Sequence, residues 1–593
     1  MAPETSPDLT LPQLVLSHAR THPDDTGLRQ KTQSGWTDIS WKTFAERAGN
    51  CAAGLLELGV GPPRHVAMFA DNRSEWTIAQ IATNLIGGVA LGCYPTSSAE
   101  DLRHALGHGD VQVLVCQDAR FLEKAKEALD GLERLTHIVL MQGEGPGALT
   151  LAELEAAGAK ALSRDPDLLG AFIGAQSPDA VALMVYTSGS TGPPKAAMLT
   201  HRNMQAQAMA FGERLNYRPN GVVLSYLPMC HIAEQAMSLF TPLFHRTAVA
   251  FGGGLPTLVE DLRAVRPTYF SGVPRVWLRL QDEIVKDFEA SGRIEDLRSA
   301  LRAGEPTACK PKADWTAAET AERARHAGVG AQARALVGLD RAKVATSGGA
   351  SLPVETLTFF RALGFQLLEL FGMTEACSIM TLQHPDRVVP GTVGEPISGV
   401  ELKLASDGEI LVRGDNVFEG YYKSPQASAA ALEGGWLHTG DVGRLEDGQL
   451  RIVDRKKDIM ITDGGKNIAP AEIEALMRAG DLIQECVLVA DGRKYVSALI
   501  QIDPSSFGPG ASYEALAASR ETEARVAAEI RRLNEKLARV AQIKRAYILP
   551  EPLRQDRGDL TATLKLRRFK VHQRYAREIE AIYAGDLGFD VYG

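Results

Sequence analysis

The sequence predicts an α/β fold, with a large N-terminal domain of α/β subdomains followed by a small α+β C-terminal domain. Three observations lead to this prediction. The chain has 593 residues, which is too long for one hydrophobic core. Helical and strand-like stretches alternate over most of its length, which is typical of parallel sheets flanked by helices. After Leu402 the pattern changes to short strands separated by turn signals.

The elements of the N-terminal part follow from their apolar patterns. An amphipathic pattern predicts a helix over 45–59, and a second helix is expected over 76–86. Short apolar runs predict strands over 65–70, 111–116 and 181–187. Residues 284–342 are rich in Ala, Arg and Glu and predict helices around a loop, which could form a lid, an insertion or a plain helical layer.

The C-terminal part is expected to contain several short strands and one long helix. Over 525–543 a single helical face would carry Val526, Ile530, Leu533, Leu537 and Val540. This face would pack on the sheet of the small domain, with a coiled-coil dimer as the alternative. The charged run DRKKD at 454–458 suits an exposed hinge, so we place the domains at 1–454 and 455–593.

Composition excludes several classes of protein. The formal net charge is −9, so the chain has no overall attraction for nucleic acid or anionic lipid. Its seven cysteines include no C-x-x-C pair, which argues against disulfides and cysteine-bound zinc and fits a reducing cytosol. We find no signal peptide and no membrane span, and we expect a cytoplasmic protein, with peripheral membrane contact left open. His104 and His108 could share a helical face, but they lack the glutamate of H-E-x-x-H and predict no metal site.

The strongest local signal is YTSGSTGPPK at 186–195. It follows an apolar, β-prone stretch, and its glycines permit close approach of backbone N–H groups to an anion. Its hydroxyl groups and Lys195 add donors and a positive charge. The spacing differs from that of a Walker A loop. The segment therefore predicts a cradle for the β- and γ-phosphates of ATP, formed by Thr187, Ser188, Gly189, Ser190, Thr191 and Gly192.

Further motifs follow this loop in a characteristic order. They are YLPMCH (226–231), SGGASL (347–352), FGMTE (371–375), GEILVRG (408–414), HTGD (438–441), DRKKD (454–458), GGKN (464–467) and TLKLR (563–567). With them the chain resembles, over nearly its whole length, the adenylate-forming superfamily of acyl-CoA synthetases, peptide-synthetase adenylation domains and luciferases. The resemblance implies a small C-terminal domain that moves during the reaction.

The resemblance also implies roles at a nucleotide site. Thr374 would contact the α-phosphate, and Glu375, with Thr187, would bind Mg²⁺, a hard cation that prefers oxygen ligands. Asp441 would accept hydrogen bonds from the ribose hydroxyls, and Arg455 would make a second contact to ribose or phosphate. The adenine would lie against small residues, with an aromatic side chain over its other face. The residues expected there are Gly348, Gly349, Ala350, Phe371, Gly372 and Met373.

Two half-reactions are implied. Lys565 would be the mobile catalytic lysine, although Leu564 stands where glycine is commoner in the superfamily. Rotation about Lys457 would then bring Gly464, Gly465 and Lys466 toward the site for transfer to coenzyme A. His231 would gate or line an acyl tunnel.

The substrate expected from the resemblance is a long-chain fatty acid. The segments closest to long-chain or bubblegum-type synthetases are DNRSEW (71–76), SYLPMCHIAEQ (225–235), SGVPRVW (271–277) and RKKDIMITDGGKNIAP (455–470). The alternatives are a medium-chain or aryl acid–CoA ligase, an acyl-AMP ligase that does not use CoA, and a non-enzymatic binding protein that kept the fold. The predicted cofactors are ATP, Mg²⁺ and coenzyme A.

Overall fold

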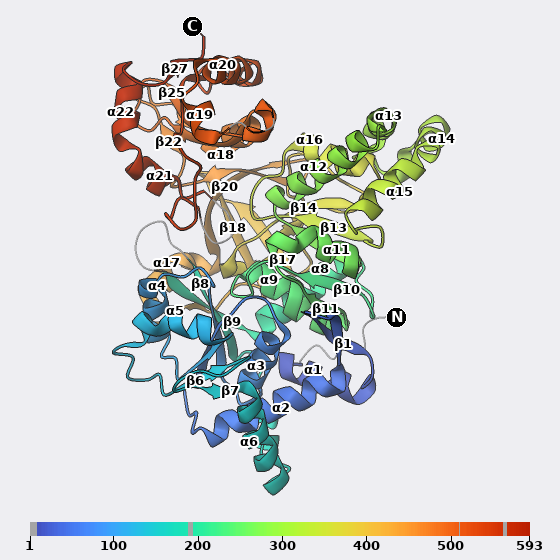
Figure 1. Ribbon diagram of the computed structural model, residues 1–593, viewed down its shortest axis with the longest axis vertical. Helices are drawn as coiled ribbons and strands as arrows, with labels where there is room; N and C mark the ends of the chain where they lie inside the picture. Colours follow the sequence, from blue (N-terminus) through green and yellow to red (C-terminus); the bar gives the residue numbers. More distant parts are fainter. Residues whose placement is uncertain (1–8, 188–193, 509, 511, 561–565, 593) are drawn as a thin grey trace.

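The computed structural model of the protein describes residues 9–187, 194–508, 510, 512–560 and 566–592. Several sheets with helices around them make up the N-terminal part (Figure 1). The C-terminal residues form a separate unit at the end of the molecule opposite helix α6 (Leu151–Arg164).

The largest sheet has eight strands in the order β19-β9-β8-β4-β3-β5-β6-β7. Its strands are β3 (His65–Phe69), β4 (Val89–Cys93), β5 (Val113–Cys116), β6 (His137–Leu140), β7 (Leu149–Thr150), β8 (Val181–Thr187), β9 (Lys195–Thr200) and β19 (Gly420–Tyr421). The strands from β8 to β7 run parallel, whereas β9 and β19 add antiparallel pairs at one edge. The central strand β3 is buried along its whole length, as expected for a parallel sheet covered on both faces.

The helices of this region lie close to the predicted positions. The helix predicted over 45–59 is α2 (Trp41–Glu57), and that predicted over 76–86 is α3 (Ser74–Leu85). Helix α2 packs closely against α6 because glycines face each other: a Cβ on Gly158 would lie 1.8 Å from the backbone oxygen of Asn50. A four-stranded sheet of order β10-β11-β1-β2 lies beside this group. Its strands are β1 (Thr26–Thr32), β2 (Gly35–Ser40), β10 (Val222–Ser225) and β11 (Ala248–Phe251).

A five-stranded sheet of order β12-β13-β14-β15-β16 presents the carboxyl ends of three parallel strands at one edge. The strands are β12 (Tyr269–Gly272), β13 (Val344–Ser347), β14 (Leu367–Phe371), β15 (Thr381–Leu382) and β16 (Glu395–Pro396). The segment predicted to be helical over 284–342 is helical and forms a layer with α16 (Val354–Ala362) beside this sheet (Figure 1). Its helices are α12 (Pro274–Ala290), α13 (Ile294–Gly304), α14 (Ala317–Arg325) and α15 (Ala327–Leu336).

An antiparallel sheet connects the two parts of the chain. It has the order β17-β18-β20-β21, with β17 (Val400–Leu404), β18 (Glu409–Gly414), β20 (Leu437–Glu446) and β21 (Gln449–Arg455). The apolar core divides after this sheet: the large N-terminal cluster extends to Leu450, and the next cluster begins at Met460. The chain passes from one core to the other between these two residues.

The C-terminal unit is built around the sheet β24-β25-β26-β27. Its strands are β24 (Ile483–Val489), β25 (Val496–Ile502), β26 (Ile543–Ile548) and β27 (Phe589–Asp590), and its longer helices are α18 (Pro470–Arg478), α20 (Arg520–Asn534), α21 (Arg568–Arg574) and α22 (Ala576–Ala584).

The helix predicted over 525–543 is wrong in its C-terminal half, because α20 ends at Asn534. The side chain of Asn534 accepts a hydrogen bond from the backbone N–H of Ile543 at 3.1 Å and donates one to its carbonyl at 2.9 Å. These bonds turn the chain directly into β26. Val540 is consequently 46% exposed and lies outside the helix. The first three apolar positions of the predicted face, Val526, Ile530 and Leu533, are buried in the core of the unit, as expected for packing on its own sheet.

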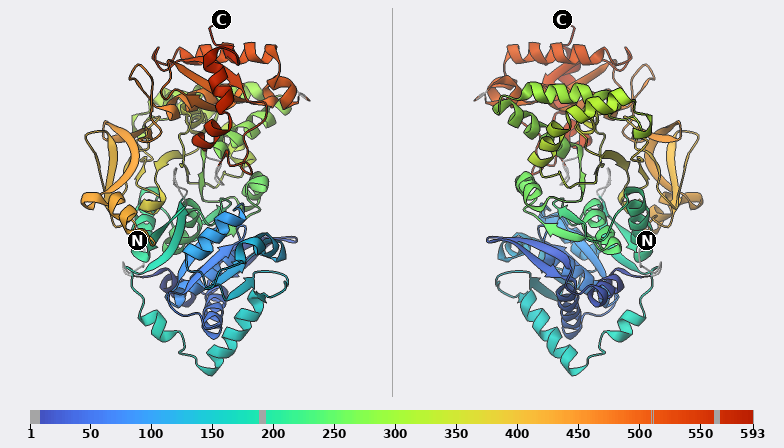
Figure 2. Two further views of the ribbon diagram at one scale, coloured as in Figure 1. Left: turned by 90° about the vertical axis from the view of Figure 1, so that its left-hand side faces the viewer. Right: turned by 90° about the vertical axis from the view of Figure 1, so that its right-hand side faces the viewer.

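The two units meet along the helices next to the five-stranded sheet. The C-terminal unit lies at one end of the molecule in both side views, next to the helical layer (Figure 2). Arg275 of α12 pairs with Glu485 of β24, and Lys536 lies 3.5 Å from Glu355 of α16. In the part of the chain that the structure describes, no helix is both long enough and apolar enough to span a membrane.

Candidate functional site

The ends of the predicted phosphate loop are held by an antiparallel strand pair. Thr187 ends β8 and Lys195 begins β9, and the two residues are partners in the ladder. The Thr187 hydroxyl donates to the carbonyl of Lys195 at 3.4 Å. The loop between them therefore begins and ends at one point of the sheet edge. Residues Ser188, Gly189, Ser190, Thr191 and Gly192 lie outside the described residues.

Lys195 and Glu375 come together at Tyr421. The Nζ atom of Lys195 lies 5.2 Å from the centroid of the Tyr421 ring, within cation–π range. The hydroxyl of the same tyrosine donates to Oε1 of Glu375 at 2.7 Å. Glu375 is only 8% exposed, so its carboxylate is aimed into the protein rather than toward bulk water. Lys195, at the end of the predicted phosphate loop, and the motif at 371–375 therefore lie close together.

The turn that carries Thr374 and Glu375 depends on a glycine. Thr374–Ala376 forms one 3-10 turn directly after β14. A Cβ added to Gly372 would lie 1.4 Å from the backbone oxygen of Ser378, which no side chain can avoid. Met373 closes the turn, because its carbonyl accepts from the N–H of Ser378 at 3.0 Å. Glycine at position 372 therefore lets the chain fold back and present the carboxylate.

The residues predicted to contact adenine follow the neighbouring strand. Gly348 comes directly after β13, and a Cβ there would lie 2.3 Å from the side chain of Leu370. Gly349 has a φ of +82° and is exposed, as is Ala350. Phe371 ends the adjacent strand β14 and is half-buried. Since β13 and β14 are parallel neighbours, these residues lie at the same sheet edge as Glu375.

Asp441 and Arg455 face each other on neighbouring strands. They are ladder partners in β20 and β21, and Arg455 Nε lies 3.3 Å from Asp441 Oδ1. Asp441 is 5% exposed, whereas half of the Arg455 side chain is exposed. A cleft of about 310 Å³ opens beside this pair, lined by Thr439, Gly440, Arg455, Lys456 and Lys457. A buried carboxylate next to a basic cleft is a suitable environment for a sugar hydroxyl and a phosphate.

Lys457 connects this cleft to Glu375 by charge. Partial burial lowers the pKa of Lys457, and the positive charge of Arg455 lowers it further, whereas the charges of Asp441 and Glu375 act in the opposite direction. These groups, together with the neighbouring Asp458, are therefore within electrostatic reach of this lysine. Arg455 and the predicted hinge residue Lys457 both line the cleft, and Asp441 is the ladder partner of Arg455.

The described end of the C-terminal tail also approaches the site. Lys565 itself lies outside the described residues, but Arg567 lies close enough to Tyr94 for its charge to act on that phenol. Burial raises the pKa of Tyr94, with a contribution from the neighbouring Cys230, and the charge of Arg567 opposes this rise. Tyr94 follows β4 of the large sheet. The tail thus reaches the N-terminal part at the edge where β4 and β8 end.

The turn at 464–466 is a hairpin within the C-terminal unit. Thr462 accepts at its carbonyl from the N–H of Gly465 at 2.8 Å, and its hydroxyl accepts from the N–H of Lys466 at 3.1 Å. Gly464, Gly465 and Lys466 are all exposed in this hairpin between β22 (Met460–Ile461) and β23 (Asn467–Ile468). Among the described residues, the hydrogen bonds of this turn stay within the C-terminal unit, so they do not connect it to Lys195 or Glu375.

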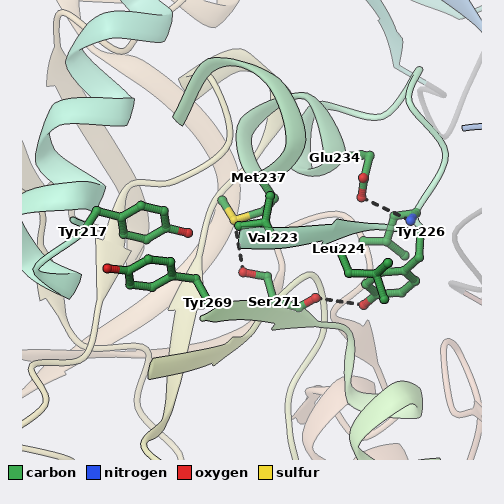
Figure 3. A pocket seen from close by; sticks show the side chains of 9 residues that line it. Tyr217, Val223, Leu224, Tyr226, Glu234, Met237, Tyr269 and Ser271 are labelled. Atoms are coloured by element: carbon green, nitrogen blue, oxygen red, sulfur yellow. Dashed lines mark hydrogen bonds between the residues drawn. The ribbon is translucent and has the colours of Figure 1, made fainter. Parts of the chain in front are cut away.

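His231 caps a short helix beside a closed cavity. Its Nδ1 accepts from the N–H of Ala233 at 3.1 Å at the start of α9 (Ile232–Gln235). The preceding residues line a cavity of about 10 Å³, the volume of a single water molecule, between β10 and β12 (Figure 3). The cavity is lined by Tyr217, Val223, Leu224, Tyr226, Leu227, Glu234, Met237, Tyr269 and Ser271.

Glu234 is the acidic group of this cavity. Burial raises its pKa to about 7, against hydrogen bonds from Ser238 at 2.5 Å and from the N–H of Leu227 at 3.1 Å. A π-helical turn, Ala236–Phe240, follows it and places Met237 on the wall of the cavity (Figure 3). Such turns are frequent at functional sites.

Comparison with known proteins identifies the family. Residues 16–422 match the family model described as AMP-binding enzyme, and residues 457–586 match the one described as AMP-binding enzyme C-terminal domain. The chain belongs to the AMP-binding enzyme family. This confirms the resemblance predicted from the ordered motifs.

Two relatives of this AMP-binding enzyme align over nearly its whole length. It is 33% identical to the long-chain-fatty-acid–CoA ligase FadD15 of Mycobacterium tuberculosis over 96% of both chains. It is 30% identical to the long-chain-fatty-acid–CoA ligase ACSBG2 of Xenopus laevis, over 97% of this chain and 84% of that one. Among solved structures it is similar to the anthranilate CoA ligase AuaEII bound to anthranoyl-AMP, with a TM-score of 0.73 and 18% identity over 98% and 99% of the two chains. This likeness confirms the predicted fold class.

One residue of the AMP-binding enzyme's site was missed by sequence reasoning. Tyr421 contacts both Lys195 and Glu375, yet it lies 46 residues beyond Glu375 in the chain. The available signal was weak: a glycine followed by two tyrosines, in the run FEGYYKS. Such a run is typical of an edge strand and does not by itself indicate a ligand site.

Proposed function

We propose that the protein is an ATP-dependent long-chain fatty acid–CoA ligase that forms an acyl-adenylate and then an acyl-CoA thioester. The observation that carries the proposal is the meeting of Lys195 and Glu375 at Tyr421, together with the cleft lined by Arg455, whose ladder partner is Asp441. This arrangement offers a positive charge for phosphates, a buried carboxylate for a divalent cation and a second carboxylate for a ribose. The relatives that align over the whole chain carry the name of the same activity.

In the first half-reaction a carboxylate oxygen of the substrate attacks the α-phosphorus of ATP. The bond from that phosphorus to the bridging oxygen breaks, and pyrophosphate leaves. Lys195 and Thr374 would stabilise the negative charge on the phosphate oxygens, and Lys565 would bridge the carboxylate and the α-phosphate. Asp441 and Arg455 would orient the ribose, while Gly348, Gly349, Ala350 and Phe371 would enclose the adenine.

The residues present fit a magnesium ion. Glu375 supplies a buried carboxylate whose Oε1 accepts a hydrogen bond from Tyr421, and this hard oxygen ligand suits Mg²⁺. Glu375 and Thr187 would hold the ion against the phosphates. When bound, it would neutralise part of the charge on the phosphate oxygens.

The second half-reaction would require the C-terminal unit to turn. The sulfur of the CoA thiol attacks the acyl carbon, the bond from that carbon to the phosphate oxygen breaks, and AMP leaves. We propose that Lys457 is the hinge and that Gly464, Gly465 and Lys466 approach the site after rotation, with the domains divided as 1–454 and 455–593. The change of core between Leu450 and Met460 supports a hinge in this stretch.

The acyl chain would extend from His231 toward the cavity between β10 and β12. That cavity holds about 10 Å³, so its wall must move to admit a hydrocarbon chain. Met237 is a flexible side chain on a π-helical turn and could provide that movement. Burial of the chain would then stabilise the complex by about 0.8 kcal/mol per methylene.

The test is ATP–pyrophosphate exchange with purified protein, Mg²⁺ and a series of fatty acids of graded length, beside benzoate as an aryl acid. We expect exchange that is strongest with long chains, and AMP release that depends on added CoA. Exchange without any CoA-dependent AMP release would identify an acyl-AMP ligase instead. No exchange with any acid would refute the proposal.

The matched variant is Lys565→Ala. It should abolish exchange, because the positive charge that bridges the attacking carboxylate and the α-phosphate is lost. It should spare thioester formation from preformed acyl-AMP, which does not need that charge. Equal loss of both half-reactions would contradict the role proposed for Lys565.

A further inference from the structure

His104 and His108, which predict no metal site, contact the residues on either side of the predicted phosphate loop. They stand four residues apart on α4 (Ala99–His108), and their rings stack with centroids 5.2 Å apart and planes 21° apart. Helix α4 begins where Ser98 accepts from the N–H of Asp101 at 3.1 Å. Its C-terminal turn faces the end of β8, so both rings point toward the start of the loop.

Each histidine contacts one end of the loop. Nε2 of His104 lies 2.9 Å from the carbonyl oxygen of Pro194, the last residue before Lys195. Nδ1 of His108 lies 3.0 Å from the hydroxyl of Tyr186, the residue before Thr187. Both imidazoles also contact the Tyr186 ring edge-on, at 5.9 Å between centroids. One helical face therefore touches the residues on either side of the loop.

The partners of the two histidines determine which imidazole nitrogen carries a proton. A carbonyl oxygen can only accept, so Nε2 of His104 must carry the proton that it shares with Pro194. The Tyr186 hydroxyl donates its single proton to the carbonyl of Ala105 at 3.1 Å. The partner nitrogen of His108 must then donate to the phenol oxygen. Three hydrogen bonds, each with a defined donor, therefore connect the helix to the two ends of the loop, and the side chains that form them are half-buried.

The helix itself is anchored to the strand that carries Tyr421. At the end of α4, Asp110 accepts from the Tyr422 hydroxyl at 2.7 Å and pairs with Lys423 at 2.7 Å. Lys423 also donates to the carbonyl of His108 at 3.0 Å. The support under the loop is thus continuous with the segment that positions Glu375.

We infer that His104 and His108 are positioning residues that hold the two ends of the phosphate loop at the separation needed to bind the β- and γ-phosphates. This inference rests on the proposed function, because it assumes that the loop binds those phosphates. Both rings contact residues that flank the loop, so in this proposal they act on the terminal phosphates only through the loop. Their effect should therefore be confined to ligands that carry the terminal phosphates.

The experiment compares ATP with AMP, which lacks the phosphates that the loop would hold. Binding of each nucleotide to the full-length protein is measured by titration calorimetry, and KM for ATP and kcat are measured by pyrophosphate exchange. For His104→Ala we expect ATP binding to weaken about five- to tenfold, the effect of one lost hydrogen bond, with KM rising accordingly. AMP binding should be unchanged and kcat should change less than twofold.

Conservative variants separate positioning from packing. His104→Gln can still donate to Pro194 from its amide nitrogen and should restore ATP binding. Tyr186→Phe keeps the ring but removes the hydroxyl, so it should reproduce the ATP-specific loss. Arg103→Gln is the control, since Arg103 is exposed on the same helix and donates instead to the carbonyl of Glu127.

The outcomes are distinguishable. If the wild-type protein exchanges pyrophosphate but His104→Ala and Tyr186→Phe bind ATP as tightly as it does, the inference is wrong. If these variants bind ATP and AMP equally weakly, the inference is also wrong, because that result would indicate general disruption of the structure. If His104→Ala does not fold, Tyr186→Phe and His104→Gln still decide the question. Failure of the wild-type protein to exchange with any acid would instead refute the proposed function.

Discussion

Replacing Glu474 by glutamine should destabilise the C-terminal unit by about 3 kcal/mol. Glu474 lies on α18 and is only 3% exposed. Arg568, three residues after the predicted catalytic lysine, donates to its two oxygens at 3.0 and 2.7 Å. Burial disfavours the charge on Arg568, but the carboxylates around it raise the pKa of its guanidinium, so it stays charged.

The size of the expected destabilisation follows from the charge of Arg568, which the variant leaves buried without its partner. Removing one partner of a buried pair typically costs about 3–5 kcal/mol, because the other charge stays buried without compensation. Here Asp458 lies 3.6 Å from Arg568 and would compensate in part, which favours the lower end of that range. Glutamine can still accept the hydrogen bond that Leu488 donates to Glu474 at 2.9 Å. The loss is therefore electrostatic rather than a loss of packing.

The assay is urea unfolding followed by a probe confined to the C-terminal unit, whose core is separate from that of the N-terminal part. A loss of about 3 kcal/mol should lower the midpoint by roughly 1–3 M, given typical slopes for small domains. The control is the double variant Glu474→Gln/Arg568→Met, which removes both charges of the pair and should regain most of the stability. If the double variant is less stable than the single one, or if the single variant loses less than about 1 kcal/mol, the reasoning is refuted.

Three further predictions concern other parts of the molecule. Burial lowers the pKa of His201 to about 3, so its side chain stays neutral in the folded state, whereas the unfolded chain binds a proton as the pH falls through 6.5. This group should therefore lower the stability by about 1.6 kcal/mol between pH 6.5 and pH 5, and His201→Gln should reduce the slope of the urea midpoints measured across that range. Gly372→Ala should abolish pyrophosphate exchange, because its Cβ would overlap the backbone oxygen of Ser378 and displace the turn; an active, fully folded variant would contradict this. Tyr421→Phe removes a hydrogen bond to a carboxylate worth about 1.5–3 kcal/mol, and it should raise the Mg²⁺ concentration needed for half-maximal exchange about tenfold or more, with no change expected in the melting temperature beyond a few degrees.

The fold could be predicted wherever a local pattern decides the structure. Strand β8 is an uninterrupted β-prone run, and its predicted bounds match those of the structure. Helix α20 shows where local pattern is insufficient. Apolar residues continue at helical spacing to Val540, but Asn534 forms two hydrogen bonds with Ile543 and ends the helix. Periodicity carries no information about such a bond, because its partner lies on another element.

The candidate site could also be predicted only in part. Motif order indicates which residues belong to it, but not which of them touch. Lys195 and Glu375 lie close together through their contacts with Tyr421, which is on a strand at the edge of the large sheet. His104 and His108 could be placed on one helical face from their spacing alone, but their partners lie about 80 or more residues away and become visible only in the folded chain.

Lys195 and Glu375 are connected through Tyr421, which lies on β19, a strand of only two residues. Its two residues pair with β9, and the N–H of nearby Phe418 donates to the carbonyl of Glu375 at 2.9 Å. A two-residue ladder is weak by itself, so its position must be fixed by other bonds. Ser428 supplies one, accepting from the N–H of Tyr421 at 2.8 Å, and the residues that follow β19 supply others through Asp110. Asp110 lies two residues after the helix that carries both histidines. A change at Asp110 should therefore displace the ends of the phosphate loop and the carboxylate together, and both parts of the site should lose affinity for nucleotide in parallel.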